Sequence, residues 1–310
     1  MRRINPIVLG IVGDSAAGKT TMGNGIARIL GEHRVTVIDT DDYHRYNRIE
    51  RTKRKITALH PEGNYLDIIE QHLELLKRGE PVLKPNYNHA TGDFDPPAYI
   101  EPRQFIIVEG MLGYFTNAMR SCYDIKAFLA PPEELRFMWK LKRDVARRGY
   151  TEEGVLKEMA LRKRDSETYI QPQRKWADMV ISFYPPAECK GETGARLNVS
   201  LILRPTLPHP DLSGVLDKDD KEGGISLGLD RDMGLPVDRL EIDGSMPDER
   251  AKQLINLLWG HIPGEHRQEH KDAIGMIAGA TGQDTRSYPL AITQLLVGLH
   301  LLKAASGHYD

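Results

Sequence analysis

The segment GIVGDSAAGKTT, residues 10–21, constrains the fold of this chain more than any other. Gly13, Gly18, Lys19 and Thr20 match the spacing G-x-x-x-x-G-K-[ST] of a phosphate-binding loop. Small residues in such a loop let consecutive backbone N–H groups turn inward around phosphate oxygens, and the N-terminus of the following helix adds partial positive charge. The alternative is an ordinary link between a strand and a helix.

The residues on both sides of the loop favour phosphate binding. Ile7 to Val12 form an apolar run typical of a buried strand, and Thr20 to Leu30 have the pattern of a helix that ends at Gly31. We therefore predict that the loop binds a nucleotide, with Lys19 at the β- and γ-phosphates and the Thr20 hydroxyl on Mg²⁺. The predicted nucleotide-binding residues are Gly13, Asp14, Ser15, Ala16, Ala17, Gly18, Lys19, Thr20 and Thr21.

Composition and charge narrow the class of protein. The 310 residues are enough for one large α/β domain or two smaller ones. The 42 basic and 44 acidic residues nearly cancel, so the net charge indicates neither a nucleic-acid nor a membrane partner. Cys122 and Cys189 have no metal-binding spacing and suit a reducing compartment. No apolar run approaches the ~20 residues of a transmembrane helix, so we expect a soluble cytoplasmic protein.

Strand-like and helix-like segments alternate through the first 190 residues. Near-continuous apolar runs of this kind indicate a parallel sheet that is covered on both faces. The predicted strands span residues 6–12, 34–39, 104–110, 124–130 and 178–184, and the predicted helices span 19–30, 65–78, 132–148 and 151–177. We therefore predict an α/β fold of the P-loop NTPase type, doubly wound around a mainly parallel sheet, with ligands beyond the carboxyl ends of the strands.

The pattern changes after Pro185 and Pro186. Two further strands have a more antiparallel character, a polar loop or hairpin lies between them, and three helical stretches follow. In chain order these segments span residues 196–205, 207–224, 237–244, 248–262, 265–279 and 289–304. We predict a P-loop core over residues 1–188 and a C-terminal α+β extension over residues 189–310 that packs on it.

The ends of the other strands should supply the rest of a phosphoryl-transfer site. Asp41 and Asp42 follow the second strand, where one carboxylate could take the proton of an attacking hydroxyl and the other could support the metal or the loop. Acidic pairs are also common turn formers, and this alternative stays open. Glu109 ends the third strand, and its position is typical of a carboxylate that holds Mg²⁺ or its water.

The stretch HRYNRIERTKRK, residues 44–55, contains six lysines and arginines. Such a cluster can indicate nucleic-acid binding, but only two aromatic residues interleave with it and no helical periodicity supports a groove reader. His44, Arg45 and Arg48 follow the acidic pair directly, so we favour a phosphorylated small substrate.

A second cationic stretch, RFMWKLKRDVARRGY, spans residues 136–150. At 100° per residue, its polar side chains share one helix face. They are Arg136, Lys140, Arg143, Asp144 and Arg147. A solvated helix surface is the usual explanation, but beside a P-loop sheet this composition favours a lid whose arginines stabilise charge on the transferring phosphates. We expect LRKRD at residues 161–165 to add to it.

Together these segments resemble the phosphoribulokinases, within the phosphoribulokinase and uridine kinase group of P-loop kinases. The resemblance rests on DDYHRYNR, ALHPEGNYLD, KPNYNHATGDFDPP, FIIVEG, WKLKRDVARRGYT and QPQRKWADMVI, in that order. The closing GATGQDTRSYPLAITQLLVGL resembles the end of the plant and cyanobacterial form, so the resemblance covers nearly the whole chain.

The resemblance implies a homodimer that uses ATP and Mg²⁺ to phosphorylate the C1 hydroxyl of D-ribulose 5-phosphate, as in carbon fixation. It implies that Asp41 is the general base and that Glu109, with Thr20, supports the metal. It further implies catalytic roles for Lys19, Lys140, Arg143 and Asp144, and sugar-phosphate binding by His44, Arg48, Tyr87, His89 and Arg148.

Two other functions remain open at this point. One is a related kinase that acts on uridine or on another sugar phosphate. The other is a nucleotide-binding scaffold without turnover, whose signature would be the loss of Lys19, Asp41 or Glu109. All three residues are present.

Overall fold

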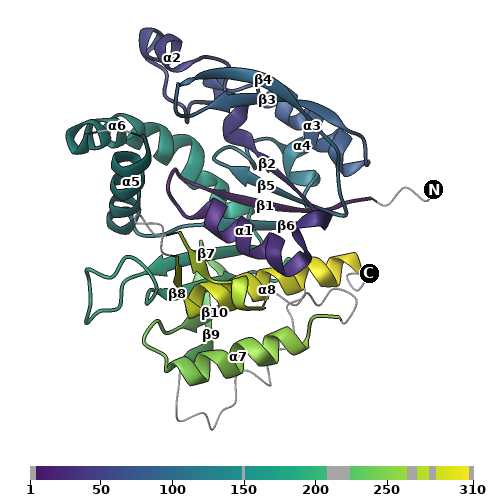
Figure 1. Ribbon diagram of the computed structural model, residues 1–310, viewed down its shortest axis with the longest axis vertical. Helices are drawn as coiled ribbons and strands as arrows, with labels where there is room; N and C mark the ends of the chain where they lie inside the picture. Colours follow the sequence, from purple (N-terminus) through teal and green to yellow (C-terminus); the bar gives the residue numbers. More distant parts are fainter. Residues whose placement is uncertain (1–4, 149–150, 208–223, 264–270, 279–283, 307–310) are drawn as a thin grey trace.

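A single large sheet runs through the protein (Figure 1). The computed structural model describes residues 5–148, 151–207, 224–263, 271–278 and 284–306, and of residues 147 and 148 the backbone alone. Within this part of the chain the sheet has eight strands in the order β2-β5-β1-β6-β7-β8-β10-β9.

Five parallel strands form one side of this sheet. They are β1 (Ile7–Gly13), β2 (Val35–Asp39), β5 (Phe105–Gly110), β6 (Ile125–Leu129) and β7 (Met179–Tyr184). β1 lies at the centre, where Leu9 pairs with Ile107 on one side and Ile125 on the other. The prediction of a mainly parallel α/β sheet is confirmed. Because the strands are parallel, their carboxyl ends meet at one edge, where the P-loop lies.

Helices cover both faces of the sheet. Side chains along β1 alternate between the two faces, and the apolar residues on each face pack against a layer of helices. Leu9 and Ile11 face a core formed with α1 (Lys19–Leu30), α7 (Asp248–Gly260) and α8 (Tyr288–Ala305). Val8 and Val12 face a second core formed with α3 (Leu66–Lys77) and α4 (Asn117–Ser121). The remaining helices, α2 (Arg48–Arg54), α5 (Glu133–Arg148) and α6 (Glu152–Asp165), project from the sheet, as Figure 1 shows.

The C-terminal third continues the same sheet. β8 (Asn198–Leu203) pairs antiparallel with β7, and β10 (Leu235–Ile242) lies antiparallel between β8 and β9 (Ile225–Asp232). The two extension strands that the sequence predicts therefore have the antiparallel character expected of them. The division of the chain at residue 188 stays a prediction.

Besides α2, α4 and β9, which were not predicted, the structure differs from the predicted elements in three places. Residues 82–100 form a hairpin that the sequence analysis missed, with strands β3 (Val82–Asn88) and β4 (Asp93–Ile100). The helix predicted over 151–177 leaves the α conformation after Asp165 and continues as a π turn and then a 3₁₀ turn, in which Pro172 offers no N–H.

The third difference lies in the extension. Of the helix predicted over 265–279, residues 271–278 are described, and they form a 3₁₀ turn and the strand β11 (Met276–Ile277). β11 pairs with β12 (Thr285–Arg286), so the helix prediction is wrong there. Of the predicted polar loop, residues 208–223 lie outside the described residues.

α8 is the most apolar of the described helices. By length and composition alone it could cross a membrane, a property that the sequence analysis overlooked, but 78% of its residues are buried inside the protein. Gln294 on this helix is fully buried, donates from Nε2 to the Thr21 carbonyl at 2.9 Å and accepts from the Gly275 N–H at 2.8 Å. Only glycine fits opposite it on α1, because a Cβ on Gly25 would lie 2.0 Å from the Gln294 amide carbon.

We expect Gln294→Leu to lower the free energy of unfolding by about 1–3 kcal/mol, because it leaves the buried Gly275 N–H without its acceptor and removes the bond to the Thr21 carbonyl. Urea unfolding measures the change. The matched control is Thr293→Val on the same helix, since the Thr293 hydroxyl bonds only to the Pro289 carbonyl one turn back. Equal losses in the two variants would contradict this account.

Candidate active site

The phosphate-binding loop has the geometry that its sequence predicts. β1 ends at Gly13 and α1 begins at Lys19. Gly18 caps α1 with φ of +93°, a left-handed conformation that side-chain-bearing residues rarely adopt. The buried Lys19 ammonium donates to the carbonyls of Gly13 at 3.1 Å and Asp14 at 3.0 Å, so it is held over the loop.

Glu109 and Thr20 meet beside this lysine. The Thr20 hydroxyl donates to Glu109 Oε1 at 3.1 Å. Oε2 is buried and has no hydrogen-bond partner among the described residues. Burial raises the pKa of Glu109, an effect that Lys19 opposes.

An unsatisfied carboxylate oxygen next to a threonine hydroxyl fits the oxygen ligands that Mg²⁺ prefers. The described residues contain no cluster of three or more histidine, cysteine or acidic side chains that could hold a metal. This arrangement suits an ion that keeps several waters and takes its other ligands from phosphates, so Thr20 and Glu109 fit the metal role.

The two carboxylates after β2, Asp41 and Asp42, lie in different surroundings. Asp42 accepts from the Lys84 ammonium and, at 3.2 Å, from the Tyr87 N–H, so it anchors the β3–β4 hairpin. Asp41 makes no side-chain hydrogen bond to another described residue. Asp39 Oδ1 accepts from the Asp41 N–H at 2.8 Å. The pKa of Asp39 is raised well above its ordinary value by burial and by the charges of Asp41 and Glu109.

The hairpin brings the predicted sugar-binding residues next to the acidic pair. The buried His44 ring contacts the Tyr87 ring edge to face at a centroid distance of 4.7 Å, and His89 lies 6.4 Å from it. The Arg48 guanidinium donates to the His89 carbonyl at 2.6 Å. Arg51 donates a hydrogen bond to the Tyr87 hydroxyl at 2.6 Å and so helps to fix the position of the Tyr87 ring.

α5 and α6 are joined by a buried ionic cluster. The Lys140 ammonium donates to Asp144 at 2.5 Å and to Glu158 of α6 at 2.9 Å. Arg143 donates to Asp144 at 2.8 Å and points its other end toward Ser15 of the loop, at 3.5 Å. Burial acts to raise the pKa of Asp144, but hydrogen bonds from Arg143 and Lys140 outweigh this effect and lower the pKa.

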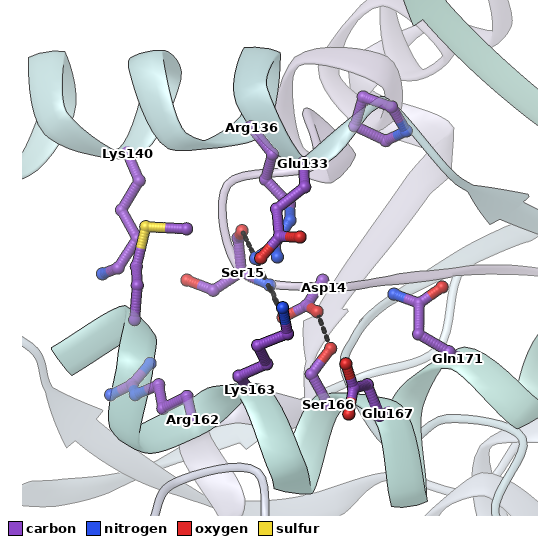
Figure 2. Close-up of a pocket in the computed structure, with 12 residues that line it drawn as sticks. Asp14, Ser15, Glu133, Arg136, Lys140, Arg162, Lys163, Ser166, Glu167 and Gln171 are labelled. Carbon is purple, nitrogen blue, oxygen red and sulfur yellow. Dashed lines mark hydrogen bonds and ion pairs between the residues drawn. The ribbon is translucent and has the colours of Figure 1, made fainter. Parts of the chain in front are cut away.

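A cavity of about 190 Å³ lies between these helices and the phosphate-binding loop (Figure 2). Figure 2 shows Arg136 and Lys163 pointing toward Asp14 and Ser15. Lys140 and Arg162 also line the cavity, but both are paired with Glu158. Asp14 accepts a hydrogen bond from the Ser166 hydroxyl and lies 3.4 Å from the Arg136 guanidinium. This one carboxylate therefore connects the loop to α5 and to the turn after α6. Asp14, Glu133 and Glu167 also line this space, so among its charged side chains Arg136 and Lys163 are the ones placed to meet phosphate groups beside the loop.

The predicted site residues therefore gather from the ends of β1, β2 and β5, from the hairpin and from α5. The side chain of Arg148 lies outside the described residues. Several supporting residues were not predicted, because their role depends on partners distant in sequence. They are Asp39, Arg51, Asn64, Lys84, Glu158 and Ser166. For Asn64 and Lys84 a signal existed, since both belong to segments on which the resemblance rests.

Comparison with known proteins agrees with this geometry. Residues 8–189 match the model of the phosphoribulokinase / uridine kinase family. The phosphoribulokinase of Synechocystis sp. is 33% identical over 77% of this chain and 76% of its own length. The chain belongs to the phosphoribulokinase / uridine kinase family. The predicted resemblance and the prediction of a phosphotransferase are thereby confirmed.

Other relatives place the chain within this family. The chloroplastic phosphoribulokinase of Arabidopsis thaliana is 35% identical over 64% of this chain, which spans 55% of that protein's length. A uridine kinase of Chloroflexus aggregans is 32% identical over 58% of this chain and 88% of its own length. The solved structure of phosphoribulokinase from Rhodobacter spheroides superposes with a TM-score of 0.58 at 20% identity, covering 83% of this chain and 96% of that one. This likeness shows the fold.

We expect Asp144→Asn to lower the free energy of unfolding by about 3 kcal/mol at neutral pH, because it removes one of the two carboxylates that balance the buried Lys140 and also the partner of Arg143. The pKa of Asp144 is lowered in the folded state, so the stabilisation is full above its ordinary pKa and is lost as the pH falls below about 4. Chemical unfolding at several pH values measures both effects.

The matched control is Glu249→Gln, which removes an exposed ion pair with Lys252. We expect it to change stability by less than about 0.5 kcal/mol. A cost for Asp144→Asn that is equally small, or that does not shrink in acid, would contradict the role assigned to this cluster.

Proposed function

We propose that this protein catalyses the ATP-dependent phosphorylation of the C1 hydroxyl of D-ribulose 5-phosphate, giving ribulose 1,5-bisphosphate and ADP. The observation that carries the proposal is the position of Asp41. Its charge acts on Glu109 at the nucleotide end of the site and on His44 at the sugar end. A carboxylate whose side chain makes no hydrogen bond to another described residue, and whose charge acts on both ends of the site, is suited to receive a proton from the acceptor hydroxyl.

The other residues of the site take complementary roles. The N–H groups of the loop and Lys19 hold the β- and γ-phosphates, and Arg143 and Lys140 offset the negative charge that builds up during transfer. Arg48 binds the phosphate of the sugar. Mg²⁺, held by Thr20 and Glu109, would neutralise phosphate charge when bound.

A second candidate is a related kinase that acts on uridine or on another sugar phosphate. Uridine kinases match this chain over much of their own length, which supports that alternative. The similarity to the Synechocystis phosphoribulokinase covers more of this chain, which favours ribulose 5-phosphate. Coupled ADP release with ribulose 5-phosphate and with uridine as acceptors separates the two, and turnover with uridine alone would reject our proposal.

We also propose a cytoplasmic homodimer that supplies ribulose bisphosphate for carbon fixation. The resemblance to phosphoribulokinases supports the dimer and the pathway. Light scattering of the purified full chain tests the dimer. A monomer at micromolar concentration would reject that part.

We expect Asp41→Asn to lower kcat by several orders of magnitude and to leave the affinity for ATP nearly unchanged, because the base acts in the chemical step and the loop holds the nucleotide independently. Steady-state kinetics and ATP binding measure this. The control is Asp42→Asn, which we expect to loosen the hairpin through Lys84 and to lower stability more than kcat. Near wild-type turnover by Asp41→Asn would move the role to another carboxylate.

We expect Arg48→Ala to raise KM for ribulose 5-phosphate by about 10- to 100-fold with little change in KM for ATP, because a hydrogen bond to a charged group contributes equally in ground and transition states. The matched control is Arg45→Ala, since exposed Arg45 stacks on Tyr65 instead. If KM for ATP rises and that for the sugar does not, the two substrates bind in the opposite orientation.

A further inference from the structure

Asn64 belongs to the segment ALHPEGNY, for which the proposed mechanism has no role. Its backbone forms an antiparallel bridge with His44. On one side of this bridge the Arg45 N–H donates to the Gly63 carbonyl at 2.8 Å, and on the other the Tyr65 N–H donates to the Tyr43 carbonyl at 2.8 Å. The two residues are therefore held in register, and their side chains meet with His44 Nδ1 2.7 Å from Asn64 Oδ1.

The orientation of the Asn64 amide follows from its other contacts. Nδ2 lies 3.1 Å from the Ala58 carbonyl oxygen and 2.9 Å from the His60 carbonyl oxygen, so it donates to both. The flipped amide would place an oxygen against two carbonyl oxygens. Oδ1 therefore faces His44, and because Oδ1 can only accept, Nδ1 must carry a proton.

Burial and neighbouring charges determine whether the His44 ring carries a second proton, on Nε2. His44 is only 2% exposed. Burial and the nearby Arg51 lower its pKa to about 3, against the opposing effects of Asp41 and Asn64, and His89 acts in the same direction as Arg51. The ring is therefore neutral at physiological pH, with a lone pair on Nε2, which makes no hydrogen bond to another described residue.

We propose that Asn64 is a positioning residue that fixes His44 as a neutral hydrogen-bond acceptor for a hydroxyl group of the sugar substrate. The lone pair on His44 Nε2 repels phosphate oxygens and accepts a hydrogen bond from a donor such as a hydroxyl group. His44 therefore recognises a hydroxyl, and Arg48 binds the phosphate. The identity of the sugar rests on the proposed function, whereas the protonation state of His44 does not.

The first test is ¹⁵N NMR of the histidine rings in the unaltered full chain without substrate, with the His44 signals assigned from a His44→Gln sample. We expect a protonated Nδ1 and an unprotonated Nε2 across neutral pH. A proton on Nε2, or a charged ring, would overturn the proposal. This result is independent of turnover, so it stands apart from any failure of the proposed function.

The second test uses Asn64→Ala, which frees the His44 ring. We expect KM for ribulose 5-phosphate to rise about tenfold, as for one lost hydrogen bond, with kcat and KM for ATP little changed. Inorganic phosphate, measured as an inhibitor against ribulose 5-phosphate with ATP saturating the P-loop, reports on the phosphate subsite of the sugar. Its inhibition constant should stay unchanged in Asn64→Ala and rise in Arg48→Ala.

A matched control separates this effect from a general loss of stability. Asn198→Ala removes a comparable contact in the extension, where Asn198 Oδ1 accepts from the Gly244 N–H at 2.8 Å. We expect this control to leave the His44 NMR signals and the sugar KM unchanged. If Asn64→Ala weakens inhibition by phosphate as much as it raises KM for the sugar, His44 contacts the phosphate and the proposal is wrong.

Discussion

The Asp14 carboxylate connects the phosphate-binding loop to everything that closes over it. It is 3% exposed, and it accepts from the Ser15 N–H at 2.8 Å and from the Ser166 hydroxyl. Arg136 of α5 lies at 3.4 Å from the same group. A buried charge needs such partners, and here the partners come from the loop itself, from α5 and from the turn after α6. The positions of the two projecting helices are thus tied to the conformation of the loop.

Three carboxylates lie close together beside the loop, and their repulsion has a consequence for ligand binding. Burial raises the pKa of Asp39 and Glu109, and the charge of Asp41 raises both further. Lys19 offsets part of this repulsion. A divalent cation would offset more, so the negative charge that raises the pKa of Asp39 and Glu109 also favours a metal ion.

Local signals in the sequence predict the centre of the candidate site. The loop spacing, the strand that ends in Glu109 and the acidic pair after β2 are each readable within a few residues, because strand ends in a parallel sheet are set by topology. The hairpin at residues 82–100 was not readable, since Pro85, Pro96 and Pro97 interrupt its strand pattern. Asn64 and Lys84 act through His44 and Asp42, and contacts over 20 and 42 residues leave no periodic trace in one sequence.

The helix prediction was wrong over residues 271–278 for a related reason. The described residues of this segment do not follow their local pattern but pair Met276 with Arg286 and donate the Gly275 N–H to Gln294. The same glutamine reaches the carbonyl of Thr21, in the first turn after the loop. In the other direction, buried Arg204 of the extension donates to the carbonyls of Arg174, Lys175 and Ala177 and to Asp232. Residues beyond 188 therefore support both the helix that follows the loop and the turns that follow α6. The change in sequence pattern near residue 188 marks the end of the parallel strands, whereas the packing around the site continues into the extension.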